Sequence, residues 1–403
     1  MSGPARATPH ASSKATVLDV IRAAGTISRV GLINATGFTG ATISTLVRKL
    51  IDEGLVVETG RAESTGGKRR VLLQLNHTSR YAVGVHLDHA GITYVLTNLG
   101  GSVVARLARA GAGAEDPSTV VARMAAEVSA LIDGVDVERD RVLGLGLVSP
   151  AMRQWEGYPL DRALEQATGL PVVLDNDATA AALGEHWSGG IGGTATSAAL
   201  YMGTGIGAGL VINGITYRGT SGNAGEIGHV CVDANGPVCW CGGRGCVEAV
   251  AGPAAVVASA LAHPELRLEL KGVSVASDFA AVSRAARRGE SAALELLERS
   301  ARYVAVAART LANLMDLEVL VLTGPGFAIA GAVYLPVVRE ELERAFFSRA
   351  AHPVDVRLSR SASTAPAIGA AALVLQSELV PLNEGLRLPE NLAAAEPAPL
   401  PLP

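Results

Sequence analysis

The sequence predicts an α/β protein preceded by a small, helical, positively charged module, and three observations support this. Three short helical patterns come first, and the rest of the chain repeats a series of apolar strands followed by a helix. The charge changes sign at the same boundary. Residues 1–80 hold 11 Lys/Arg against 5 Asp/Glu, a net +6, whereas the remaining 323 residues hold 23 against 33, a net −10. A basic head on an acidic body is typical of a nucleic-acid-binding module joined to another domain, with a chance fluctuation as the alternative.

The head has the pattern of a known DNA-binding arrangement. Helical patterns cover residues 14–24, 29–35 and 40–53. Thr39 is a candidate N-cap for the last of these, and strand patterns at 55–58 and 70–75 then enclose a polar loop. Two helices joined by a glycine-containing turn and followed by a hairpin predict a winged helix-turn-helix, whose last helix enters the DNA major groove. The alternative is a three-helix protein-interaction domain with a solvated basic face.

Candidate DNA contacts lie off the apolar stripe of the last head helix and along the hairpin. Hydroxyl side chains there can reach base edges or phosphates, and cationic side chains neutralise phosphates. The predicted DNA-binding residues are Thr42, Ser44, Thr45, Arg48, Lys49, Arg61, Lys68, Arg69 and Arg70.

The body repeats one series of elements. Its first series has strands at 81–88, 92–97, 102–107 and 142–148, with a helix at 118–132. Its second has strands at 198–202, 207–212 and 319–322, with helices before the last. These periodicities establish an α/β class, and the 4% aromatic content predicts cores built mainly from Ala, Val and Leu. No apolar run has the length of a membrane span, and the first residues lack a signal-peptide stretch, so we expect a cytoplasmic protein with no membrane partner.

A metal site is predicted from clustered thiols. Three of the four cysteines, Cys239, Cys241 and Cys246, lie within eight positions, and His229 precedes the first of them by ten. Three thiolates and one imidazole can form the closed tetrahedral site of a structural Zn²⁺. The alternative is a set of free thiols packed in a core. Cys231 is expected to be an ordinary small buried residue.

The run from Ser28 to Val56 and the motif from His229 to Cys246 resemble the ROK family (repressors, open reading frames, kinases). The resemblance extends to about residue 376 and implies a two-lobed, actin-like (ribonuclease-H-like) ATPase-fold domain behind the winged helix-turn-helix. The expected organisation is a disordered N-terminus at 1–13, a DNA-binding domain at 14–78, a sugar-kinase-like effector and dimerisation domain with zinc at 79–380, and a disordered Pro/Ala-rich tail at 381–403.

The resemblance also implies a ligand site. In sugar-binding members of the family, the Glu and His of a Glu-x-Gly-His element contact sugar hydroxyls, and the His also binds zinc. The implied sugar-binding residues here are Asn176, Asp177, Glu226, His229 and Glu248. In the kinases, the aspartate that matches Asp177 is the general base. Taken alone, Asp177 at a strand-to-helix junction would be interpreted as a helix N-cap.

Departures from the family's kinases indicate lost phosphotransfer. The first phosphate loop should read Asp-x-Gly-Gly-Thr, but this chain has Asp88-His89-Ala90-Gly91-Ile92. Ala90 hinders the close approach of a phosphate, and Ile92 replaces a hydroxyl. The adenosine-side loop at 323–326 is only partly preserved, whereas the second phosphate hairpin at 202–209 is intact. The segment 150–155, which in the family walls one side of the sugar cleft, is shorter here, so the alternatives are a more open, an altered or a lost sugar site.

Together these features predict a DNA-binding transcriptional regulator, a repressor of carbohydrate-related genes, with no catalytic residues beyond the relict candidate Asp177. Its expected partners are a palindromic double-stranded DNA operator, a sugar or sugar-phosphate effector, and further copies of itself in a homodimer or homotetramer. Its expected cofactor is structural Zn²⁺. Two alternatives remain open. One is an active ATP-dependent sugar kinase with a DNA-binding head, and the other is a zinc-containing dimerisation scaffold without a small-molecule effector.

Overall fold

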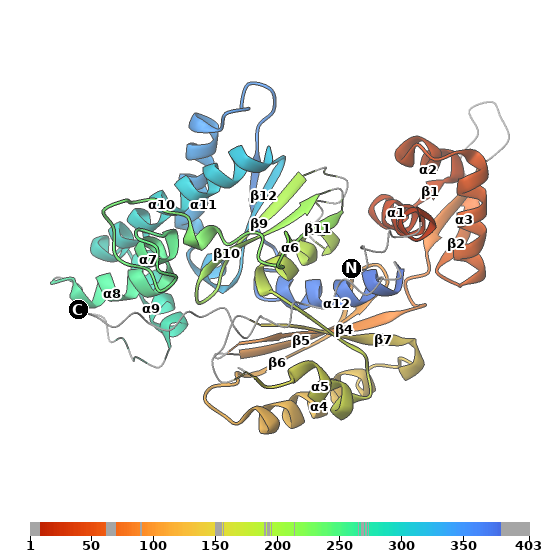
Figure 1. Cartoon of the computed structure of the whole chain (residues 1–403), viewed down its shortest axis with the longest axis horizontal. Coiled ribbons are helices and arrows are strands. Elements are labelled where there is room, and N and C mark those ends of the chain that lie inside the picture. The colour runs from red at the N-terminus through yellow and green to blue at the C-terminus, as the bar shows by residue number, and fades with distance from the viewer. Residues whose placement is uncertain are drawn as a thin grey trace, which may run out of the picture.

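The structure is a computed structural model, and Figure 1 shows a small head beside a body of two lobes. It describes residues 9–61, 70–88, 91–149, 155, 157–188, 191, 194, 196–212, 214–264, 266, 270, 272 and 274–379. The expected tail at 381–403 and most of the expected irregular N-terminus lie outside these residues.

The head is a winged helix-turn-helix, as predicted. Its elements are α1 (Pro9–Ala24), β1 (Ile27–Ser28), α2 (Arg29–Thr36), α3 (Gly40–Asp52), β2 (Val56–Arg61) and β3 (Val71–Leu75), and its sheet has the order β1-β3-β2. The Thr39 side chain caps α3 by accepting a hydrogen bond from the backbone N–H of Thr42 at 3.2 Å. Gly37 ends α2 with a φ of 69°, a left-handed conformation that favours glycine.

Two details of the head differ from the sequence prediction. Helix α1 begins at Pro9 rather than at residue 14, so residues 9–13 are helical rather than irregular. The two-residue strand β1 was not predicted, because a strand this short has no periodicity to detect.

The first lobe is built on a five-stranded sheet with two outer helices. Its elements are β4 (Tyr81–Leu87), β5 (Gly91–Asn98), β6 (Val103–Ala110), α4 (Pro117–Asp133), η1 (Arg139–Arg141), β7 (Val142–Val148), α5 (Leu160–Thr168) and β8 (Val172–Asp175). The strand order is β6-β5-β4-β7-β8. Strands β4 to β6 pair antiparallel, and β7 and β8 join in parallel.

The second lobe repeats this topology. Its sheet contains β9 (Thr196–Met202), β10 (Ile206–Ile212), β11 (Ile215–Tyr217), β12 (Val319–Thr323) and β13 (Asp355–Leu358), in the order β11-β10-β9-β12-β13. If the strands of each sheet are numbered in chain order, both sheets read 3-2-1-4-5. The predicted pair of repeated α/β units is therefore confirmed.

Two helices made largely of small residues lie between the sheets, α6 (Asp177–Ser188) and α12 (Ala365–Leu379) (Figure 1). Backbones approach closely here. A Cβ added at Gly84 would lie 1.8 Å from the carbonyl oxygen of Ala367, and one added at Gly369 would lie 1.7 Å from that of Ala180. Any larger residue at these positions would force α12 away from the first sheet or from α6.

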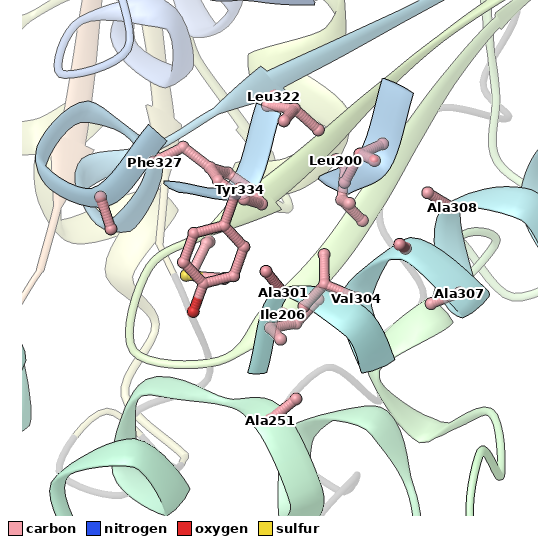
Figure 2. Close-up of a cluster of buried hydrophobic side chains, with 14 of the residues drawn as sticks. Leu200, Ile206, Ala251, Ala301, Val304, Ala307, Ala308, Leu322, Phe327 and Tyr334 are labelled. Atoms are coloured by element: carbon pink, nitrogen blue, oxygen red, sulfur yellow. The ribbon is translucent and has the colours of Figure 1, made fainter. Parts of the chain in front are cut away.

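The core of the second lobe lies between its sheet and a layer of helices. These are α7 (Val247–Ala251), α8 (Pro253–Ala262), α9 (Val275–Arg287), α10 (Ser291–Met315) and α11 (Pro325–Ala345). Figure 2 shows Leu200 and Leu322 of the sheet facing Val304 of α10 and Tyr334 of α11. The buried Tyr334 hydroxyl is hydrogen-bonded to the Ser300 hydroxyl at 2.7 Å, which satisfies its polar group.

Among the described residues, no single helix has both the length and the apolar character to cross a membrane; α2 and α3 meet the test only when taken together, and they are bent by 119°.

Candidate functional site

Four metal-ligand side chains meet in the second lobe, as the sequence predicted. The donor atoms of His229, Cys239, Cys241 and Cys246 all lie within 4.8 Å of one another. The sulfurs of Cys241 and Cys246 are 3.7 Å apart, and Nδ1 of His229 is 3.6 Å from the sulfur of Cys239. A tetrahedral Zn²⁺ with bonds of about 2.3 Å to sulfur and about 2.0 Å to nitrogen separates two sulfurs by about 3.8 Å and a sulfur from a nitrogen by about 3.5 Å. The donor set therefore fits that ion.

Local backbone geometry places these donors. His229 ends the short helix η3 (Ile227–His229), and Cys246 is the N-cap residue of α7. The N–H of Gly243 donates to the Cys241 sulfur at 3.4 Å. Gly245 has a φ of 63°, and a Cβ there would lie 1.6 Å from the Asp233 carbonyl oxygen, so the loop requires glycine at that position.

The expectation for the fourth cysteine was wrong. Cys231 is exposed rather than buried, and it does not belong to the four-residue metal group. Its backbone forms an isolated antiparallel bridge with Cys246, yet its sulfur is not among the four clustered donor atoms.

His229 links the metal group to the predicted ligand site. Its Nδ1 faces Cys239, whereas its Nε2 lies 4.0 Å from a carboxylate oxygen of Glu226. The indole of Trp240 packs edge-on against the imidazole, with ring centroids 4.8 Å apart. One ring nitrogen of His229 can thus hold a metal while the other remains free to bond a ligand hydroxyl.

Glu248 is fixed by two hydrogen bonds. The N–H of Ile206 donates to its Oε2 at 3.0 Å, and the Trp240 indole N–H donates to its Oε1 at 2.9 Å. A Cβ at Gly205 would lie 2.2 Å from Oε2, so glycine is needed there to admit the carboxylate. Trp240 was not predicted as a site residue, although its place inside the cysteine loop could have indicated that it lies beside the ligand site.

Asn176, rather than Asp177, caps α6. The Asn176 side-chain oxygen accepts from the N–H groups of Ala178 at 2.8 Å and Thr179 at 3.2 Å. The alternative interpretation of Asp177 as the N-cap is therefore wrong by one residue. Asp177, the first residue of the helix, has a side chain that is not required as the cap.

Besides burial, carboxyl groups from both lobes, Asp88 and Glu226, affect the pKa of Asp177. Burial raises the pKa of Asp177 to about 7, and although the Ala178 N–H lowers it, the charges of Asp88 and Glu226 raise it further. Burial also raises the pKa of Glu226, opposed by His229 and supported by Glu248. Four of the five predicted ligand residues, Asp177, Glu226, His229 and Glu248, are thus linked electrostatically, and Asn176 directly precedes the first of them.

An ion pair that the sequence analysis did not predict joins the lobes beside this site. Nη1 of Arg218, which follows β11, donates to Oδ1 of Asp175 at 2.6 Å, and Nη2 lies 2.6 Å from Oδ2. Asp175 ends β8 directly before Asn176 and is only 6% exposed. Nothing in the local pattern of either segment signals this pairing.

The turn expected to form the first phosphate loop connects β4 and β5. Asp88 donates its N–H to the Gly91 carbonyl at 3.1 Å, and Leu87 pairs with Ile92. Ile92 is fully buried in the core of the first lobe, so the inference that it removes a hydroxyl from the loop is not supported. Ala90, His89 and the shortened segment at 150–154 lie outside the described residues.

Tyr201 lies between the two glycine-containing loops that the resemblance associates with nucleotide. A Cβ at Gly203 would be 2.9 Å from Cε1 of the Tyr201 ring, and one at Gly324 would be 2.9 Å from Cδ2 and Cε2. The ring is 3% exposed, and its T-shaped partner is the buried His86 at 6.4 Å. Tyr201 was not predicted as a site residue because it precedes the glycine motif by one residue.

The predicted DNA-binding residues on α3 share its outer face. Ser44, Thr45, Arg48 and Lys49 are exposed, while Ile43, Leu46, Val47 and Leu50 are buried in the head. The Thr42 hydroxyl is hydrogen-bonded to that of Thr39, and the Ser44 hydroxyl to the Gly40 carbonyl. Arg70 is exposed, whereas Lys68, Arg69 and the side chain of Arg61 lie outside the described residues.

Comparisons with known proteins follow the same division into head and body. The ROK family model matches residues 120–377. A putative xylose repressor of Caldicellulosiruptor sp. (strain Rt8B.4) is 29% identical over 91% of this chain and 96% of its own length. A glucokinase of Halalkalibacterium halodurans is 30% identical over 75% of this chain and 97% of its own length. Among solved structures, a ROK family transcriptional regulator described as a homolog of the E. coli MLC protein matches with a TM-score of 0.71 and 25% identity, over 93% of this chain and 98% of that one.

Proposed function

Since the chain belongs to the ROK family, we propose that it is a DNA-binding repressor of carbohydrate-related genes, whose kinase-like body binds a sugar or sugar phosphate as effector. The observation that carries this proposal is the winged helix-turn-helix, whose exposed helix face presents hydroxyls and cations over a buried apolar stripe. The match to the solved regulator extends over the head, whereas the glucokinase match covers 75% of the chain. The head distinguishes a regulator from a simple kinase.

The effector class follows from the side chains that converge near α6. Asn176 offers an amide, Asp177 a carboxyl that carries a proton below about pH 7, and Glu226 and Glu248 carboxylates. His229 adds a ring nitrogen that faces this group. Donors and acceptors mixed within one site suit a ring of hydroxyl groups, each of which both donates and accepts. A polyhydroxylated ligand matches this set better than an apolar one.

Zinc is the cofactor we propose, with a structural role. All four donors come from the protein, which leaves no open coordination position for catalysis. The bound ion would hold His229 and the Cys239–Cys246 loop in place. Because Trp240 lies in that loop and bonds Glu248, the ion would also orient the ligand site.

Phosphotransfer is absent in this proposal. The strongest support is Tyr201, whose ring takes up the space against Gly203 and Gly324 where a nucleotide would need close backbone approach. The competing function is an active sugar kinase, which the intact hairpin at 202–209 and the 30% identical glucokinase favour. A measurement of sugar-dependent ATP turnover separates the two.

We propose that two heads bind a palindromic operator from a homo-oligomer, a dimer or tetramer, because one head spans only a half-site. The test uses the full chain and the duplex that it enriches in an in vitro selection. Fluorescence anisotropy measures the affinity for this duplex with and without D-xylose, D-glucose or N-acetylglucosamine. We expect one of these sugars to lower the affinity by at least about tenfold, a coupling of roughly 1.4 kcal/mol. Selection that enriches no duplex would refute the regulator proposal.

A further inference from the structure

Helix α6 has the predicted effector pair at one end and contacts the DNA-binding head at the other. We propose that α6 transmits effector binding to the head through Trp187 and His186, and that Arg22 and Asp19 of α1 receive it. The inference rests on the proposed function, since it concerns the regulation of the same site.

The first contact joins Arg22 to Trp187. The Arg22 guanidinium lies over the indole, with its central carbon 4.8 Å from the ring centroid, and its Nη1 donates to the Trp187 carbonyl at 3.1 Å. The Arg22 side chain is only 7% exposed. A Cβ at Gly101, in the β5–β6 turn, would lie 3.2 Å from Cε3 of Trp187. The indole thus contacts both the head and the first lobe.

The second contact joins Asp19 to His186. Oδ2 of Asp19 lies 3.9 Å from Nε2 of the almost fully buried His186, and Oδ1 accepts from Nε and Nη2 of Arg22 at 2.9 and 2.7 Å. Oδ2 would also lie 3.0 Å from a Cβ at Gly214, which is in the β10–β11 turn of the second lobe. The Asp19 carboxylate therefore holds Arg22 of its own helix with one oxygen and faces His186 of α6 with the other.

Helix α1 therefore contacts a turn of the second lobe directly, at Gly214, and reaches a turn of the first lobe through Trp187, which lies against Gly101. Gly101 belongs to the first lobe and Gly214 to the second, and the apolar residues of α1 share one core with α12. A change in the angle between the lobes would separate these contacts unequally. Since α1 also packs on α3, a displaced α1 moves the helix that carries the predicted DNA contacts.

Helix α6 is suited to carry such a displacement. All residues from Ala178 to Trp187 are buried, and the helix spans about 18 Å at 1.5 Å per residue. It has close backbone contacts on two sides: a Cβ at Gly209 of β10 would lie 2.3 Å from the Ala178 carbonyl, and one at Gly369 of α12 would lie 1.7 Å from that of Ala180. A movement at Asp177 cannot be absorbed by compressing these contacts.

Unsatisfied polar atoms at the far end indicate that this arrangement is not the only one. Nδ1 of His186 and the indole nitrogen of Trp187 are buried and, within the described part of the chain, make no hydrogen bond, and Nε2 of His186 has only its 3.9 Å contact with Asp19. Most buried polar groups in native proteins are hydrogen-bonded, so these are the groups that a second arrangement of the contact would satisfy. In the second state, the indole N–H and the imidazole would gain partners that α1 now keeps away.

The experiment compares Arg22→Met with Arg288→Met, which removes an exposed guanidinium from its surface pair with Glu290. For each variant, anisotropy gives the affinity for the selected duplex with and without the sugar that acts on wild type, and calorimetry gives the affinity for that sugar. We expect Arg22→Met to bind the sugar within about threefold of wild type but to lose at least about three quarters of the sugar's effect on the logarithm of DNA affinity. Arg288→Met should retain the whole effect.

Full sugar response in Arg22→Met would overturn the inference and leave the proposed function intact, whereas wild type that binds the duplex without any sugar response would refute both. If Arg22→Met fails to fold, Asp19→Asn replaces it, since this keeps the shape but removes the charge between Arg22 and His186. Hydrogen exchange of wild type gives an independent reading. The sugar should increase exchange in the α1 segment at 9–24, and unchanged exchange there would also overturn the inference.

Discussion

Asp177 retains a proton at pH values where an ordinary aspartate is ionised, because burial raises its pKa from 3.8 to about 7. Between these values the folded protein binds more protons at this residue than the unfolded chain does, so stability falls as pH rises from about 4 to about 7 and is level above. We expect Asp177→Asn to remove this part of the pH dependence. Urea unfolding at about pH 5 and about pH 8 measures the difference in the free energy of unfolding between the two pH values.

The control for this prediction is Asp140→Asn at an exposed position in η1, which should keep the wild-type difference between the two pH values. If wild type and Asp177→Asn lose the same stability between the two pH values, the buried, protonated state of Asp177 is wrong.

Glu248 illustrates how a side chain is prepared for a ligand before it binds. The Ile206 N–H and the Trp240 indole N–H each bond one of its oxygens, so its carboxylate is already oriented. Glu248→Gln removes the charge but keeps the size. We expect sugar binding to weaken roughly ten- to a hundredfold, the loss of one hydrogen bond to a charged group at about 1.5–3 kcal/mol. Calorimetry measures the sugar affinity, and Glu138→Gln at an exposed position is the control. Equal sugar affinities in the two variants would show that Glu248 is not part of the ligand site.

At the scale of an element, the loop from Cys239 to Cys246 depends on its metal. Metal binding and local folding are coupled, so Cys241→Ser should lose about one metal ion per chain and lower the melting temperature. Cys231→Ser is a matched control, because Cys231 is exposed on the same segment but outside the donor group. Metal analysis by mass spectrometry should find wild-type content in Cys231→Ser. Wild type without zinc would contradict the prediction.

Helix α3 carries a second prediction at this scale. Arg48 and Lys49 are exposed on its outer face, so each can neutralise one phosphate. Replacing either by Ala should weaken binding to all duplexes alike and reduce the slope of log affinity against log salt by about 1. Arg344→Ala on α11 should leave both quantities unchanged. A salt titration in which the Arg48→Ala slope equals that of wild type would exclude phosphate contact by Arg48.

For the whole molecule, the two-lobed body should bind sugar without turning over ATP. Tyr201 fills the space beside the two glycine loops that the resemblance associates with nucleotide, so we expect no sugar-dependent ADP release from ATP with D-glucose, other hexoses or the pentose D-xylose, even at high protein concentration. A coupled ADP assay measures this. Turnover that disappears in Asp177→Asn would establish the kinase function instead, because Asp177 occupies the general-base position that the resemblance implies.

Local signals in the sequence were sufficient for the head and for the metal group. Thr39 and Gly37 mark helix ends through their own side chain or backbone freedom, and the repeat of apolar strands predicted two α/β units. The four metal ligands lie within 18 consecutive residues, where the tight turns of a glycine-containing loop bring them together. In each case the partners are neighbours along the chain, so pattern and spacing are enough.

Contacts between distant segments were decided only by the tertiary structure. Arg218 meets Asp175 because the two sheets face each other across α6 and α12, and Trp187 meets Arg22 where α6 reaches the head. Tyr201 fills the space beside Gly324 because β9 and β12, far apart in the sequence, are neighbours in one sheet. The direction of Ile92 into the core likewise depends on its pairing with Leu87. The pKa of Asp177 is a further example, since desolvation is a property of the surrounding atoms and not of the residue. The sequence by itself determined which groups are present and how each segment folds. Which groups meet, and how far each is buried from solvent, depended on packing between segments that no local pattern encodes.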